Sequence, residues 1–220
     1  MGVRVPLADR MYEQLLQQLM DGSRVPGDPL NISSLSREFN VSQTPLREAL
    51  ARLEHSGLVH REALKGYSVA APFTSAEIVK LTETRILMEP AIAQEAALRR
   101  TPEFIAALSE TVDVLHSVAE GADSSTEAFS QYWNADDTFH KLIAAQSGNP
   151  FLIRTYDVLS AQIQRFRLFT KFGNTSAGVA AIEHQEIVNA LERGDATAAS
   201  VAARAHVESA RDRALARITK

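Results

Sequence analysis

The sequence predicts a mainly α-helical protein of two domains. The first, residues 1–72, combines helices with a β-hairpin, and the second, residues 73–220, is a bundle of six antiparallel helices. Three observations support this. Apolar residues recur at helical spacing along most of the chain, and strand-like segments are confined to residues 58–70. A proline and a helix-capping signal in "APFTSAE" mark a boundary between the two parts.

Composition and charge exclude several classes of protein. No apolar run approaches the roughly 20 residues that cross a bilayer, and the first ten residues lack the apolar segment of a signal peptide. We therefore expect a cytoplasmic protein with no membrane partner. The absence of cysteine excludes disulfides, thiolate metal sites and cysteine nucleophiles. The net charge is −4, so any contact with DNA must depend on local placement of cations.

The N-terminal domain begins with an amphipathic helix from Leu7 to Met20. A short helix in "SSLSREF" is followed by the turn "NVS" and by a longer helix from Gln43 to His55. In this longer helix Ser42 is the expected N-cap. Its expected buried stripe consists of Leu46, Ala49, Leu50 and Leu53.

Two strand segments follow, residues 58–62 and 67–70, and the turn between them ends in Gly66. Helices in this order with a terminal hairpin describe a winged helix-turn-helix. A generic small helical domain with a hairpin is the alternative.

If the helix that begins at Gln43 enters a DNA major groove, its exposed N-terminal side chains should reach base edges. Arg47 can chelate guanine, and Gln43 can pair with adenine. The alternative for Arg47 is an ion pair with a nearby glutamate on a solvated surface. The hydroxyls suit phosphate oxygens, and the hairpin tip suits the backbone or minor groove. The expected DNA-contacting residues are Ser42, Gln43, Thr44, Arg47, Lys65 and Gly66.

The second domain is helical throughout by pattern. Thr74 and Glu77 form a capping box at its start, and Pro90 should kink its first helix. Separators rich in Gly, Pro, Asn and Asp divide the helices. The expected helices cover residues 75–99, 102–119, 125–146, 150–171, 178–193 and 196–218.

One stretch of this domain, "WNADDTFHKL", places Asp136 four residues before His140, on one face of a helix. Such a pair often means only that an aspartate orients a buried imidazole. Two further histidines, His184 and His206, also lie near apolar stripes of predicted helices. Together the four could converge on a divalent ion such as zinc, nickel or manganese. A set of unrelated core histidines is the alternative. Asp137 points about 100° away and should not be a ligand.

The string "VSQTPLREALARLEHSGLV" closely resembles the DNA-reading segment of the GntR family of bacterial transcription regulators. That family's pattern runs V-S-R-T-P-V-R-E-A-L, followed by Leu-Glu-x-x-Gly-Leu-Val. The upstream "VPGDPL" and the downstream "KGYSVA" resemble the family's turn and wing. Gln43 stands where the family usually has arginine, so the family's base preference at that position does not transfer.

Residues 76–220 resemble the FCD ligand-binding domain of the FadR-type branch of this family. The matching pieces are the segment holding Arg85 and Glu89, "DDTFHKLIAAQSGNP", "EHQEIVNALERGD" and "AARAHVESA". Six expected helices are more similar to the VanR-type subgroup than to the seven-helix acyl-CoA-binding one. In metal-binding members one Asp and three His hold the ion. These positions map to Asp136, His140, His184 and His206.

The resemblance implies a regulator, expected to be a repressor, that acts as a homodimer on an operator in double-stranded DNA. It also implies a small organic acid effector bound over the metal, with zinc the first expectation for the ion. An arginine would favour the effector's carboxylate, and the candidates are Arg85, Arg165 and Arg167; a surface ion pair is the alternative for each. Two competing functions are a metal-dependent hydrolase and a constitutive DNA-binding protein with a structural metal.

Overall fold

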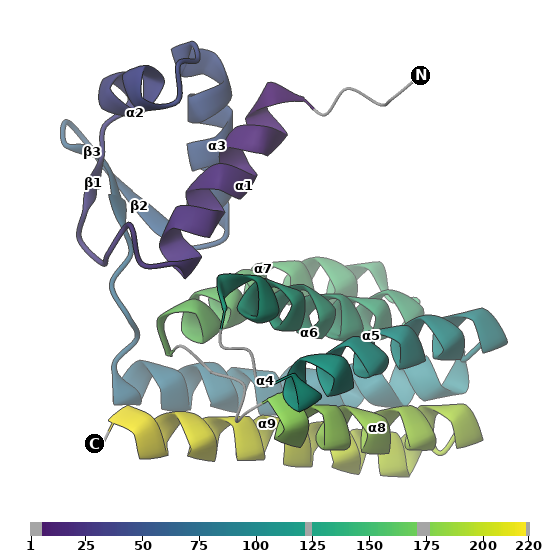
Figure 1. Ribbon diagram of the computed structural model, residues 1–220. Coiled ribbons are helices and arrows are strands. Elements are labelled where there is room, and N and C mark those ends of the chain that lie inside the picture. The colour runs from purple at the N-terminus through teal and green to yellow at the C-terminus, as the bar shows by residue number, and fades with distance from the viewer. Residues whose placement is uncertain (1–5, 122–124, 171–176, 219–220) are drawn as a thin grey trace, which may run out of the picture. The chain divides into compact units, whose positions relative to one another are not determined.

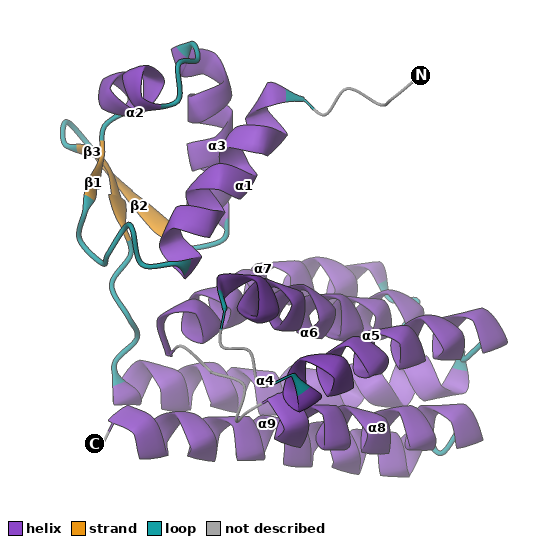
Figure 2. Cartoon of the chain, in the orientation of Figure 1, coloured by secondary structure: helices purple, strands orange, loops and turns teal. Residues whose placement is uncertain are grey.

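The computed structural model describes residues 6–121, 125–170 and 177–218. The chain divides into two compact units, Met1–Pro72 and Phe73–Lys220. Within the described residues, strands occur only in the first unit, and the second consists of helices (Figure 2). The predicted mainly helical fold class, a helix-turn-helix unit followed by a helical bundle, is confirmed. None of the helices described here has both the length and the apolar character needed to cross a membrane.

The first unit has its helices and hairpin in the predicted order (Figure 1). Helices α1 and α3 have the expected bounds. The predicted buried stripe of α3 is also confirmed, since Leu46, Ala49, Leu50 and Leu53 are fully buried. The elements of this unit are α1 (Leu7–Met20), β1 (Pro29–Leu30), α2 (Ile32–Glu38), α3 (Gln43–His55), β2 (Val59–Glu62) and β3 (Gly66–Val69).

The sheet of this unit has a third strand that the sequence did not predict. Strand β1 pairs antiparallel with β3, Leu30 opposite Tyr67, and β3 pairs antiparallel with β2. Two residues are too few to show an alternating pattern, so β1 exists only because β3 lies beside it. Gly66 closes the β2–β3 turn with φ +92°, a conformation that favours glycine.

The two helices of the helix-turn-helix begin differently. The side chain of Asn31 caps α2 by accepting a hydrogen bond from the backbone N–H of Ser34 at 3.1 Å, so α2 starts one residue earlier than expected. Ser42 holds the N-cap position of α3, as predicted, but its side chain makes no capping hydrogen bond. Ser42 is exposed at the start of α3, and its hydroxyl does not accept a hydrogen bond from a backbone N–H of that helix.

The second unit consists of six helices in its described residues, with bounds within one residue of those expected. The predicted capping box is confirmed: Thr74 Oγ1 accepts from the backbone N–H of Glu77, and the Glu77 carboxylate accepts from that of Thr74. Helix α4 continues through Pro90 without ending. The helices are α4 (Ser75–Leu98), α5 (Pro102–Glu120), α6 (Thr126–Gln146), α7 (Pro150–Thr170), α8 (Ala177–Arg193) and α9 (Ala196–Ile218).

A buried polar layer divides the core of this bundle. Helices α4 and α9 lie side by side, and α8 packs against α5 and α9 (Figure 1). One apolar cluster contains Ile92, Phe139 and Ile187, and the other contains Ile78 and Tyr132. Along α4, α8 and α9 the buried polar residues fall between the positions that contribute to these two clusters. The buried members of this polar layer include Arg85, Glu89, Asp136, His140, Arg167, His184 and His206.

Candidate functional site

Three buried imidazoles from three helices meet in the polar layer. His140 lies on α6, His184 on α8 and His206 on α9, and one ring nitrogen from each lies within 4.8 Å of the others. Their side chains are 6%, 0% and 3% exposed. Asp136 Oδ1 lies 3.6 Å from His184 Nε2, and Oδ2 lies 4.0 Å from His140 Nε2. The structure therefore brings together the four residues that the sequence singled out.

The free nitrogens of these imidazoles are what makes the cluster unusual. The Nε2 atoms of His140, His184 and His206 are buried and find no hydrogen-bond partner among the described residues. A buried polar atom without a partner costs about 1–3 kcal/mol, so three in one place require an explanation. Imidazole nitrogens beside a carboxylate oxygen form a donor set that suits zinc, nickel or manganese. The residues present thus fit a divalent ion.

The electrostatics of the cluster keep two of its histidines, His140 and His184, neutral. Burial lowers the pKa of His140 and of His184 well below the usual value, and the neighbouring imidazoles and arginines act in the same direction. Only a neutral imidazole can donate a lone pair to a metal. Burial raises the pKa of Asp136, while the guanidinium of Arg167, which forms an ion pair with it, opposes this.

Two further carboxylates lie beside the Nδ1 atoms of two of the histidines. Glu183 Oε2 lies 2.9 Å from His206 Nδ1, and Glu89 Oε2 lies 3.5 Å from His140 Nδ1. Arg213 holds Glu183 through two contacts, and Arg85 holds Glu89 in the same manner, with Nε–Oε1 at 2.6 Å. Glu183, Glu89 and Arg213 were not among the residues expected at this site from the sequence. Helical spacing alone does not signal such supporting residues.

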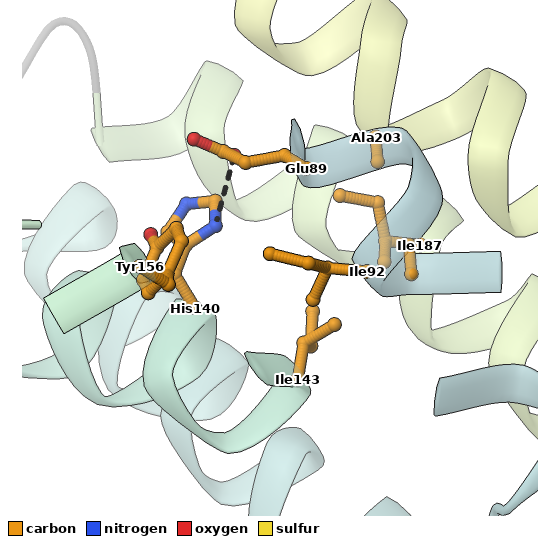
Figure 3. A pocket seen from close by; sticks show the side chains of 8 residues that line it. Glu89, Ile92, His140, Ile143, Tyr156, Ile187 and Ala203 are labelled. Atoms are coloured by element: carbon orange, nitrogen blue, oxygen red, sulfur yellow. Dashed lines mark ion pairs between the residues drawn. The ribbon is translucent and has the colours of Figure 1, made fainter. Parts of the chain in front are cut away.

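Two small cavities of about 10 Å³ adjoin the cluster, each at the lower limit of the space that holds one water molecule. The first is mostly apolar: Glu89, His140 and Tyr156 lie at one end and isoleucine side chains at the other (Figure 3). The second cavity is lined mainly by polar residues, three of which are arginines. Its lining is Arg85, Tyr132, Asp136, Phe166, Arg167, His206, Ala210 and Arg213.

The three arginines expected to bind an effector have different environments. Arg85 and Arg167 are buried and line the polar cavity, where each forms an ion pair with a carboxylate. Arg165 lies elsewhere, with its guanidinium carbon 4.1 Å from the centre of the Phe73 ring. The structure thus places Arg165 away from the cluster, because it projects from α7 in a different direction from Arg167.

Asp137 is also outside the cluster. Its carboxylate accepts hydrogen bonds from Lys141 Nζ at 2.6 Å and from Ser160 Oγ at 2.7 Å. The next residue of a helix is rotated by about 100°, which directs Asp136 inward and Asp137 toward α7.

In the N-terminal unit a groove of about 290 Å³ joins the starts of α2 and α3 to the hairpin. Gln43, Arg47, Lys65 and Gly66 line it, and the exposed Ser42 and Thr44 lie at the start of α3. Arg47 donates to Gln43 Oε1 at 3.3 Å rather than to a glutamate. Residues not expected from the sequence also line the groove, among them Asn31, Ser33, Arg61 and Tyr67.

Comparison with known proteins decides the family. The model of "Bacterial regulatory proteins, gntR family" matches residues 7–69, and that of the FCD domain matches residues 80–209. The chain belongs to the GntR family and carries an FCD domain. It is a DNA-binding transcription regulator of the GntR/FCD type, and its relatives are regulators rather than enzymes. The hydrolase alternative is therefore set aside.

Individual relatives agree with this assignment. The repressor RspR of Escherichia coli (strain K12) is 25% identical over 204 residues, which cover 92% of this chain and 86% of RspR. The fold is similar to that of E. coli McbR/YncC, with a TM-score of 0.75, 19% identity and coverage of 98% of this chain and 100% of that one. The metal-free FCD domain of the regulator TM0439 matches with a TM-score of 0.52 and 22% identity, covering 68% of this chain and 99% of that domain.

The buried ion pair of this GntR regulator gives a stability prediction. Replacing Glu89 by glutamine leaves the Arg85 guanidinium charged and buried without its counterion. We expect the free energy of unfolding to fall by about 3–5 kcal/mol. Urea unfolding followed by the fluorescence of Trp133, the only tryptophan, measures it in the FCD domain. The control is Glu95→Gln, which removes an exposed ion pair of the same helix and should cost less than about 1 kcal/mol. Equal losses in the two variants would contradict a structural role for the buried pair.

The lowered histidine pKa values give a pH prediction for the metal-free regulator. The folded pKa values of His140 and His184 lie below the unfolded value of about 6.5, so the unfolded chain binds more protons. Stability should be fully present above that pH and should fall on acidification, by up to about 1.4 kcal/mol per pH unit for each histidine. Urea unfolding from pH 7.5 to 5 measures the slope. In His184→Leu the slope of unfolding free energy against pH should fall by the contribution of one histidine, up to about 1.4 kcal/mol per pH unit. An unchanged slope would contradict the interpretation that His184 is buried and neutral.

Proposed function

We propose that the FCD domain of this regulator binds a divalent metal through Asp136, His140, His184 and His206. The observation that carries the proposal is the set of three buried Nε2 atoms without hydrogen-bond partners among the described residues. When bound, the ion would supply a concentrated positive charge that attracts a carboxylate. The donor set favours zinc first, with nickel and manganese as alternatives.

We further propose that a small organic acid is the effector and that it binds at the polar cavity. The cavity has a volume of only about 10 Å³, so binding must enlarge it. Arg85 and Arg167 line this cavity and offer the planar donors that bind a carboxylate by two parallel hydrogen bonds. Both already pair with protein carboxylates. Effector binding must therefore exchange partners or share them, which would rearrange contacts between helices of the bundle.

The proposed switch follows from thermodynamic linkage. An effector can shift the DNA-binding equilibrium only by the difference in its affinity for the two conformations. We propose that the regulator is a homodimeric repressor in the cytoplasm, where its operator lies, and that effector binding changes the spacing of its two DNA-binding units. The named repressor RspR supports the direction of control, and six described helices in the second unit support a VanR-like FCD domain.

At the DNA, we propose that the start of α3 reads bases and the hairpin tip contacts the minor groove or backbone. The base-reading residues are Gln43 and Arg47, which share the groove with Lys65 and Gly66. Ser42 and Thr44 are proposed to contact phosphates, because both are exposed at the helix start.

Metal content tests the proposal directly. Protein purified without chelators should carry about one divalent ion per chain by native mass spectrometry and elemental analysis. His184→Ala and His206→Ala should weaken Zn²⁺ binding, measured by competition with a chromogenic chelator, by more than the roughly 10–100-fold typical of changes outside the ligand shell. His116→Ala, a histidine on α5, is the control. A wild-type protein that neither retains nor binds Zn²⁺, Ni²⁺ or Mn²⁺ would refute the site.

The alternative of a constitutive DNA-binding protein with a structural metal has a distinct outcome. In that case the ion would bind and the histidine variants would lose it, but no small acid would change the affinity for operator DNA. Screening short carboxylic acids against a DNA fragment selected by the wild-type protein separates the two functions.

The DNA interface gives a further prediction. On that selected fragment Arg47→Ala should lose about 1–3 kcal/mol of binding free energy and should relax specificity at one base pair. Lys65→Ala should weaken binding evenly across sequences and reduce the salt slope by about one. Fluorescence anisotropy at several salt concentrations measures both effects. Arg204→Ala, an exposed change in the FCD domain, serves as the control. A loss for Arg47→Ala that is the same on every sequence would assign Arg47 to the DNA backbone instead.

A further inference from the structure

His206 is supported by a chain of two side chains that the metal site does not itself require. Its Nδ1 lies 2.9 Å from Glu183 Oε2. Arg213 donates to both oxygens of that carboxylate, at 2.6 and 3.0 Å, and to Ser209 Oγ at 2.5 Å. Glu183 and Arg213 are largely buried, with side chains 17% and 21% exposed. The carboxylate is therefore fixed from both sides.

The chemistry of this contact determines where the imidazole carries its hydrogen. An ionised carboxylate can only accept hydrogen bonds, so a neutral His206 must hold its hydrogen on Nδ1 and its lone pair on Nε2. Arg213 donates to both oxygens of Glu183, and such charge-assisted hydrogen bonds favour the ionised carboxylate. Glu183 therefore faces His206 as a hydrogen-bond acceptor.

The other two histidines lack this arrangement. His140 Nδ1 lies 3.5 Å from Glu89 Oε2, longer than a normal hydrogen bond. Neither ring nitrogen of His184 has a hydrogen-bond partner among the described residues. His206 is accordingly the member of the cluster whose ring orientation is set by the protein before anything binds.

We propose that Glu183 and Arg213 are positioning residues: Glu183 fixes His206 in the tautomer that presents the Nε2 lone pair to the cluster, and Arg213 fixes Glu183. The proposal rests on the metal site proposed above. Glu183 belongs to α8, whereas His206 and Arg213 belong to α9. The orientation of one ligand thus depends on the alignment of these two helices. Carboxylates in this position are known to raise metal affinity by orienting the imidazole.

Two readouts test the proposal, and the first needs no metal. Long-range ¹H–¹⁵N NMR of histidine-labelled, metal-free protein should show His206 with its hydrogen on Nδ1. Glu183→Ala should give a mixture of tautomers, whereas Glu183→Gln, whose amide oxygen can still accept, should largely preserve the wild-type form. Zn²⁺ affinity should fall about 10–100-fold in Glu183→Ala and by less in Glu183→Gln.

Arg213→Lys keeps the positive charge but loses the bidentate hydrogen bonds to Glu183. We therefore expect it to weaken Zn²⁺ binding less than Glu183→Ala does. Matched controls are Glu186→Gln, an exposed acid of α8, and Arg204→Lys, an exposed cation of α9. Both should retain the wild-type tautomer and affinity, with folding checked by circular dichroism.

Wild-type His206 with its hydrogen on Nε2, or a Glu183→Ala variant with unchanged tautomer and unchanged Zn²⁺ affinity, would overturn the proposal. Failure of the metal site would look different: the wild-type protein would bind no ion, while the tautomer would still depend on Glu183. That result would support the positioning role and reject the proposed ion.

Discussion

Charge burial is the constraint on which the FCD domain of this regulator depends. Its bundle encloses carboxylates and guanidinium groups between two apolar clusters, and isolated charges there would cost several kcal/mol each. The bundle resolves this by pairing: Arg85 with Glu89, Arg167 with Asp136, and Arg213 with Glu183. The first pair lies within α4, whereas the other two join different helices, α7 with α6 and α9 with α8, and depend on how those helices are aligned. The same pairs therefore stabilise the fold and set the geometry of the site.

After this pairing, the imidazoles are among the buried groups of the described residues that lack a hydrogen-bond partner, together with the amide of Gln164. Three arginines and three carboxylates balance one another, and burial keeps His140 and His184 neutral. The surroundings are thus close to electroneutral without an ion, and the open Nε2 lone pairs are the groups that favour a cation. A bound divalent ion would introduce positive charge into this balanced interior. An anionic effector is the natural complement, which connects the metal proposal with the effector proposal.

The polar cavity and the histidine cluster share residues. Asp136 and His206 belong to both, and Arg213 lines the cavity while it holds the carboxylate behind His206. An anion that attracts Arg213 would therefore weaken the contact between Arg213 and Glu183, the carboxylate that orients His206. A movement of His206 would in turn change the lining of the cavity. This contiguity offers a physical route for coupling through α8 and α9. In the DNA-binding unit, the groove likewise depends on β1, α2, α3, β2 and β3, which meet only after folding.

The sequence by itself determined the helices, since amphipathic spacing and caps such as Thr74 with Glu77 are local signals, and it singled out Asp136, His140, His184 and His206. It did not predict strand β1, because two residues acquire that conformation only from pairing with β3. It also missed Glu89, Glu183 and Arg213 as supporting residues, and it grouped Arg165 with Arg167. Their roles depend on the direction in which each side chain leaves its helix and on what a neighbouring helix presents there. Only tertiary packing decides such contacts, because residues distant in the chain become neighbours through it.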